Sequence, residues 1–457
     1  MKAILLFAAL SCTAFPSVLA AGEPPRTQAC AVDTQTHTNT DTVTRLVFST
    51  VLNAETNTGM RVHFREFNLG ARSYVQLTSL KDQQVQKLDA ANMTNWFETS
   101  AVFNGNRVLL ELYVATGDSG IRAVVDYLVL PCNCSPPLPV RTATAIETLC
   151  GPDDRVASTD NRVGRTSRGC TAWLISNGAV LSAGHCVPNG ATFMVNIPPS
   201  GADGTLTSSA PDDQYPIVPG SEMFVWDQNG TPANAADDID FVIFGLNPDN
   251  LGRRAHARLG FFRVTTAVPA NGAVTRTTGV GTDNTPPGST GNFNAQNQTL
   301  QTSTGGFAGQ QDLGMAGTGR IIRHSYAVDT TGGNSGSPII WEANGFTIGV
   351  HTAGGCSSDG SGANSGTSFN QANLAAAVEN FPGPNTRYLD TVTYPGAPAD
   401  TGSIFAPDHN LRAAHDRVPG GGAISIVAGA YVGVANRGTF TKPMTLVAPV
   451  GPVTLGQ

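Results

Sequence analysis

The stretch DTTGGNSGSP, residues Asp329–Pro338, decides the fold of this chain. Glycines lie on both sides of Ser335, so the backbone can make a small turn that leaves one serine hydroxyl exposed, as a nucleophilic serine requires. The backbone N–H groups of Gly333 and Ser335 can point together at one developing oxyanion. We therefore predict Ser335 as a nucleophile, with Gly333 and Ser335 forming its oxyanion hole.

Two further motifs precede this stretch. The segment LSAGHC, Leu181–Cys186, carries His185, the candidate general base. A serine hydroxyl is hardly ionised at neutral pH and needs such a base. The segment DIDFVIF, Asp238–Phe244, offers two carboxylates, Asp238 and Asp240, one of which would accept the other imidazole N–H. The order His, Asp, Ser is one of three chain orders known for this triad, and it predicts a Ser-His-Asp catalytic site.

The segment from Cys150 to about Leu374 resembles the trypsin-like serine endopeptidases of the chymotrypsin fold, and among them the bacterial glutamyl endopeptidases. The most specific parts are Asp329–Pro338 and IGVHTAGG, Ile348–Gly355. The resemblance implies two packed six-stranded β-barrels with the site between them. It also implies peptide-bond hydrolysis through an acyl-enzyme, with neither cofactor nor metal. The family pattern that follows the catalytic aspartate fits Asp240 better than Asp238.

The same resemblance implies how the substrate is selected. His351 and Thr330 would line the primary specificity pocket and hydrogen-bond an acidic substrate side chain. A histidine suits this task because it offers an N–H donor and can carry positive charge. Asp329, however, lies where trypsin keeps the acid that binds Arg or Lys. We expect cleavage after Glu or Asp, with cleavage after Arg or Lys through Asp329 as the alternative.

The cysteines predict a disulfide framework. Seven of the eight lie outside the expected signal peptide, and an exported protein pairs most of its cysteines. The resemblance implies one bridge from Cys170 to Cys186, beside the base. It implies a second from Cys150 to Cys356, which would tie the N-terminal arm to the pocket wall. Cys30 is expected to pair with a cysteine near the end of its own domain, either Cys132 or Cys134, which leaves one thiol free.

The N-terminus predicts export. Residues Ala3–Leu10 are apolar and VLAA, Val18–Ala21, supplies small residues for cleavage, which is typical of a signal peptide over residues 1–20 cut after Ala20 or Ala21. No later apolar stretch reaches the roughly 20 residues of a membrane helix. We expect a soluble extracellular or periplasmic protein without a membrane anchor. The net charge of −7 argues against a nucleic-acid partner.

Composition predicts an all-β protein of several modules. Charged residues make up 13% of the 457 residues, below the roughly 25% of typical domains, and short apolar runs alternate with Thr, Ser, Asn and Gly. Period-two runs such as RVLLELYV, Arg107–Val114, predict strands, and we expect Trp96 to be a core or edge aromatic rather than a ligand-stacking residue. Near residues 370–378 the pattern predicts a helix with an asparagine cap. We expect a jelly-roll-like β-sandwich accessory domain at 28–134, a Pro-rich linker at 135–146, the protease domain at 147–390 and a β-solenoid-like segment at 391–457.

Two functional hypotheses follow. The first is a secreted serine endopeptidase that acts on proteins or peptides. The second is a binding or adhesion protein that uses the same fold as a scaffold, while its flanking domains hold a carbohydrate or a surface polymer. The complete set of triad residues favours the enzyme, because lost activity usually shows as the loss of one member.

Overall fold

The computed structural model describes residues 26–55, 59–130, 149–187, 191–227, 239–287, 292–316, 319–381, 383–397 and 399–456. The expected signal peptide, the Pro-rich linker, Asp238, Cys132 and Cys134 lie outside these residues, and what the sequence predicts for them remains a prediction. Strands make up most of the described secondary structure, as the composition indicated. No helix in the described part of the chain has the length and apolar character needed to cross a membrane.

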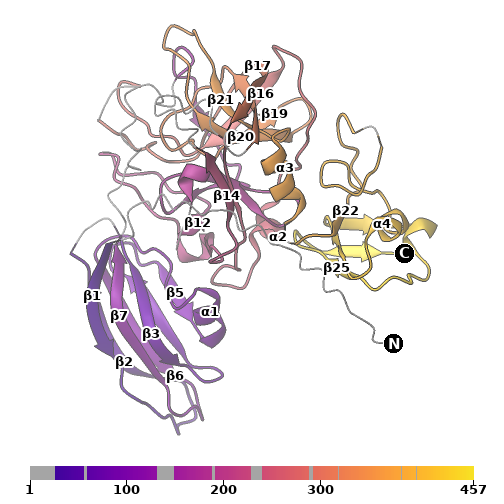
Figure 1. The fold of residues 1–457 in the computed structure, drawn as a ribbon. Helices are drawn as coiled ribbons and strands as arrows, with labels where there is room; N and C mark the ends of the chain where they lie inside the picture. Colours follow the sequence, from indigo (N-terminus) through magenta and orange to yellow (C-terminus); the bar gives the residue numbers. More distant parts are fainter. Residues whose placement is uncertain are drawn as a thin grey trace, which may run out of the picture.

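The N-terminal region is a pair of antiparallel sheets around one core, shown in indigo to purple in Figure 1. Along its strands buried and less buried side chains alternate, because successive residues point to opposite faces of a sheet. Trp96 is fully buried in this core, as expected. The jelly-roll connectivity remains a prediction. One sheet has the order β1 (Arg26–Asp33), β7 (Arg122–Leu130), β3 (Arg61–Asn68); the other has β2 (Arg45–Asn53), β6 (Arg107–Val114), β4 (Tyr74–Ser79), β5 (Val85–Leu88), followed by α1 (Ala90–Asn95).

The first sheet of the central region is open. It has the order β13 (Gln214–Pro216), β12 (Thr192–Met194), β9 (Val163–Thr166), β10 (Thr171–Leu174), β11 (Val180–Ser182), β15 (Ile239–Phe244), β14 (Met223–Asp227). Strand β15 is buried on both faces. Its alternating side chains enter two cores, Phe241 and Ile243 one of them, Val242 and Phe244 the other. Asp240 thus lies at the buried start of a strand that the surrounding cores hold on both sides.

The second sheet of the central region closes into a barrel, because β16 pairs with both β19 and β17. Its order is β16 (Val274–Gly279), β19 (Pro338–Trp341), β20 (Phe346–Ala353), β21 (Asn364–Ser368), β18 (Gly319–Tyr326), β17 (Gln301–Ala316), β8 (Val156–Ala157). The described residues therefore form one barrel and one half-barrel, where the family resemblance implied two closed barrels. The two halves share a core that contains Trp173 and Leu181 from the first and Ile340 and Val350 from the second.

The C-terminal segment packs against the central region. Helix α3 (Ala372–Glu379) begins after Gln371, so the residue at its start is not the expected asparagine. Strands β22 (Thr386–Leu389), β23 (Ala423–Ile426) and β25 (Thr445–Val447) pair in parallel, as do β24 (Gly429–Tyr431) and β26 (Val453–Leu455), with α4 (Leu411–Arg417) between β22 and β23. Tyr388 joins the central core, and buried Asp390 pairs with Arg263 at 2.6 Å. A solenoid is not shown by these short sheets, and the solenoid-like character stays a prediction.

Two amide side chains join the N-terminal sheets to the half-barrel. Gln214, fully buried at the start of β13, donates to the carbonyl of Val102 at 2.8 Å and accepts from the same residue's N–H at 2.9 Å. Asn104 makes the same pair of bonds with Ser208, at 3.0 and 2.8 Å. Each side-chain amide thus pairs with both the backbone N–H and the backbone carbonyl of one residue across the boundary. In Figure 1 the N-terminal sheets accordingly abut the region around β12.

Candidate active site

His185 and Asp240 are brought together by η1 (Gly184–Cys186) and the start of β15. The Asp240 carboxylate accepts the backbone N–H of His185 at 3.0 Å through Oδ1 and lies 2.6 Å from the imidazole Nδ1 through Oδ2. Asp240 is only 4% exposed. Burial acts to raise its pKa, but the charge and hydrogen bonds of His185, with a further contribution from Arg323, hold the pKa of Asp240 below its usual value. The pair can therefore orient an imidazole and stabilise its protonated form.

A disulfide fixes the loop that carries His185. Cys186 is joined to Cys170, which opens the short β10–β11 hairpin region, and both cysteines are buried beside Ala183. This is the bridge that the family resemblance implied. The two sulfurs lie close to the His185 ring. Because they are bonded to each other, they are not thiolate ligands for a metal ion.

The turn that carries Ser335 is built on two glycines. Gly333 has a φ of +104°, and a Cβ there would lie 2.5 Å from the carbonyl oxygen of Val280. At Gly336 a Cβ would meet the carbonyl oxygen of Thr171 at 2.2 Å and the backbone nitrogen of Ala183 at 2.8 Å. The turn of Ser335, the predicted nucleophile, therefore lies directly against the loop of His185, the predicted base, in a conformation that only glycine adopts without strain.

Thr171 holds this turn from the half-barrel. Its backbone N–H donates to the carbonyl of Ser335 at 3.0 Å, and its hydroxyl donates to the carbonyl of Gly333 at 2.8 Å. Two of the carbonyls in the predicted oxyanion turn are thus tied down on the half-barrel side. Since Thr171 follows Cys170, the disulfide, the base loop and the nucleophile turn form one connected unit.

His351 lies on β20 next to this turn. Its carbonyl accepts the N–H of Gly336 and its N–H donates to the carbonyl of Ser337, each at 2.8 Å. The side chain is fully buried, and its Nδ1 lies 2.6 Å from the hydroxyl of Tyr326, which is buried as well. Burial first, and then the nearby charges of Arg323 and His185, lower the pKa of His351 to about 3. At neutral pH its imidazole is therefore uncharged, and it can act on a carboxylate only as an N–H donor.

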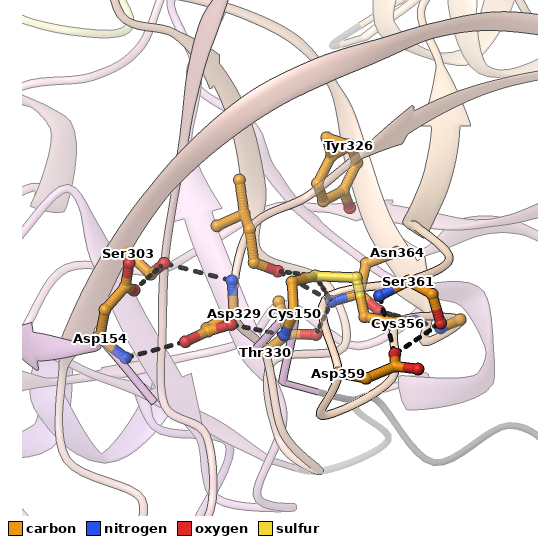
Figure 2. Close-up of a disulfide and its surroundings, with 12 residues drawn as sticks. Cys150, Asp154, Ser303, Tyr326, Asp329, Thr330, Cys356, Asp359, Ser361 and Asn364 are labelled. Atoms are coloured by element: carbon orange, nitrogen blue, oxygen red, sulfur yellow. Dashed lines mark hydrogen bonds between the residues drawn. A yellow bond between two sulfur atoms is a disulfide. The ribbon is translucent and has the colours of Figure 1, made fainter. Parts of the chain in front are cut away.

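Asp329 is directed at the N-terminal arm of the central region, as Figure 2 shows. Its carboxylate accepts the N–H of Cys150 at 2.6 Å and that of Asp154 at 2.9 Å. Burial raises the pKa of Asp329, and the two N–H donors counteract this effect. Cys150 is also joined to Cys356, the second bridge that the resemblance implied. The arm is thus fixed to the wall of the predicted pocket at two points.

Thr330 is held by a residue that the motifs did not reveal. The side-chain amide of Asn364 donates to the Thr330 hydroxyl at 3.0 Å and to the carbonyl of Val328 at 2.8 Å (Figure 2). Asn364 opens β21 and is fully buried. Neither Tyr326 nor Asn364 was predicted from the sequence, because each lies in a strand whose residue pattern carries no motif. Tyr326 stands three residues before Asp329, but nothing in the order of residues shows which ring it meets.

Comparison with known proteins assigns the family. Residues 154–373 match the family model described as Trypsin, and no curated protein matches the chain. A solved structure of a Glu endopeptidase in complex with MPD is 18% identical, with a TM-score of 0.33, over 50% of this chain and 96% of that one. The thermostable serine protease AL20 from an extremophilic microorganism is 15% identical, with a TM-score of 0.33, over 48% of this chain and 99% of that one. Through its match to the family model, the central region is a serine protease domain of the trypsin family, and its substrates are proteins or peptides.

Proposed function

We propose that the protein is a secreted serine endopeptidase that cleaves after Glu or Asp. Ser335 attacks the scissile carbonyl while His185 accepts the hydroxyl proton, and His185 later returns that proton to the leaving amine. Asp240 orients the imidazole and stabilises its cationic form. The N–H groups of Gly333 and Ser335 stabilise the oxyanion, and hydrolysis of the acyl-enzyme completes the cycle.

The observation that carries the acidic preference is the direction of Asp329. Both of its carboxylate oxygens accept backbone N–H groups of the arm, from Cys150 and Asp154. A carboxylate used in this way is a poor partner for an incoming Arg or Lys side chain. The groups that remain in the predicted pocket are the uncharged imidazole of His351 and the hydroxyl of Thr330, which both suit an acidic side chain.

Tyr326 supports the same preference through the tautomer of His351. A Tyr326 hydroxyl that donates to Nδ1 places the only imidazole proton of neutral His351 on Nε2. We infer that this N–H donates to the carboxylate of an acidic substrate side chain. An apolar substrate side chain cannot accept this hydrogen bond, and the loss of a hydrogen bond from a buried donor costs about 1–3 kcal/mol, or roughly ten- to a hundredfold in selectivity.

A peptide library tests this proposal. The native enzyme should cleave after Glu and then Asp, and His351→Ala should lose that preference while it still hydrolyses a generic ester, because the triad is intact. His324→Ala is the matched control: His324 is also a buried histidine of the barrel, bonded to Ser368, but it is not part of the predicted pocket. A native profile dominated by Arg or Lys would refute the acidic preference, as would a His351→Ala enzyme that keeps it.

Two further measurements address the remaining parts of the proposal. Labelling with a fluorophosphonate that reacts with activated serines separates the enzyme from a non-catalytic scaffold, since a scaffold would stay unlabelled. Secretion rests on the signal-peptide pattern of residues 1–20. N-terminal sequencing of protein recovered outside the cytoplasm should begin at Ala21 or Gly22, and a chain found only inside cells with Met1 intact would contradict export.

A further inference from the structure

Arg323 is a buried cation on β18 that the proposed mechanism does not use. Its side chain is 1% exposed. The Nη2 group donates to the hydroxyl of Thr352 at 2.7 Å and to the hydroxyl of Ser365 at 3.1 Å. Thr352 follows the pocket residue His351 on β20, and Ser365 lies on β21, between β20 and β18. The guanidinium therefore reaches across one strand to the strand beside the nucleophile turn.

The same face of the barrel contacts the aspartate of the triad. Opposite Arg323 in the register of β18 and β21 lies Thr367. The Thr367 hydroxyl donates to the carbonyl of Asp240 at 2.8 Å and lies 3.4 Å from the N–H of the same residue. Arg323, Thr352 and Thr367 thus form a polar cluster, and Thr367 joins this cluster to the backbone of Asp240. His351, which precedes Thr352 on β20, contacts the hydroxyl of Tyr326.

We propose that Arg323 is a positioning residue of the catalytic site, a fixed buried cation that keeps Asp240 ionised and moderates the basicity of His185. This inference rests on the triad proposed above. Asp240 is buried, and a carboxylate in such surroundings needs a compensating positive charge to remain ionised. His185 supplies one only when it is protonated, whereas a guanidinium is always charged. Arg323 therefore provides charge compensation during the part of the cycle in which His185 is neutral.

The charged and titratable groups around Asp240 predict in which direction the pH profile moves when Arg323 is removed. They are His185 on η1, Arg323 on β18 and the uncharged His351 on β20. A cation near the imidazole disfavours its protonation, and its removal makes the imidazole more basic. Activity requires the neutral base, so the acidic limb of the kcat/KM profile should move to higher pH when the cation is lost.

The experiment compares pH profiles of kcat/KM for the full-length enzyme and four variants, normalised to active sites counted with a fluorophosphonate. Arg323→Met should move the acidic limb upward by about one pH unit, the order of magnitude expected when one buried charge is removed. Arg323→Lys, which keeps the charge, should restore the native limb. Arg320→Met is the matched control, since Arg320 lies on the same strand but pairs with Asp312 at the surface. The acidic limb of the Arg320→Met profile should not move.

Thr352→Val keeps Arg323 but removes one hydroxyl group to which its Nη2 donates, so it should move the limb in the same direction by a smaller amount. This variant serves the test if Arg323→Met fails to fold. An acidic limb that does not move in a folded Arg323→Met enzyme would overturn the inference. If Arg323→Met does not fold, an unmoved limb in Thr352→Val would overturn it. It would also fail if Arg323→Lys shifts the limb as far as Arg323→Met does. The proposed function fails separately, through a Ser335→Ala enzyme that retains its activity.

Discussion

Replacing Asp329 by Asn distinguishes a carboxylate that stabilises the fold from one that binds the substrate side chain. Asparagine preserves the size of the side chain and one acceptor oxygen, but it turns an NH₂ group toward one of the two N–H groups that the carboxylate now accepts. Those donors belong to Cys150 and Asp154. Asp329 is 5% exposed, and the Cys150–Cys356 disulfide keeps the arm in place, so the orphaned N–H cannot easily turn to water. Leaving one such donor unpaired costs about 1–3 kcal/mol.

That loss corresponds to a Tm lower by about 2–12 °C for a domain of this size. It should be measured by thermal unfolding in a Ser335→Ala background, which prevents self-digestion. Asp359→Asn is the control, because Asp359 accepts hydrogen bonds from Ser361 in the exposed loop beside the same disulfide (Figure 2), and such surface changes stay within about 0.5 kcal/mol. In the active enzyme, Asp329→Asn should leave the residue preference unchanged. Loss of cleavage after Arg or Lys with an unaltered Tm would refute the reasoning.

Two other predictions concern Ser335 and the buried histidines. Ser335→Ala should lower turnover by about 10⁴- to 10⁶-fold at an unchanged Tm, because it removes the nucleophile and little volume; an active variant would end the assignment. Burial lowers the pKa of His256 and His324 to about 4 and that of His351 to about 3. Below about pH 6.5 the unfolded chain binds protons at these sites and the folded chain does not, so stability should fall from there toward pH 4 by up to about 1.4 kcal/mol per pH unit for each histidine. A Tm that stays constant between pH 7 and pH 5 would contradict this.

The sequence predicted features that depend on local backbone geometry. The glycines around Ser335 predicted a tight turn, and a Cβ at Gly333 or Gly336 would indeed collide with neighbouring backbone. The catalytic role of Ser335 stays a prediction. Period-two alternation likewise predicted strands such as β6, since one face of each strand must be buried. The family match extends this prediction to the serine protease domain. The open half-barrel and the start of α3 after Gln371 were not predictable, because both depend on how distant strands and loops pack.

What the sequence determined by itself is therefore the set of candidate residue types, their order and the glycine turn around Ser335, whose side chain is buried in the structure. Tertiary structure decided where the side chains point. Asp329 could have faced the substrate or the arm, and only the folded arm, bound through Cys150 and Asp154, supplies the N–H donors that fix its direction. Tyr326 and Arg323 gain their roles in the same way, because strand pairing brings β18 within reach of residues on β20 that lie more than twenty positions later. Contacts across a sheet depend on register and face, which residue order alone does not specify.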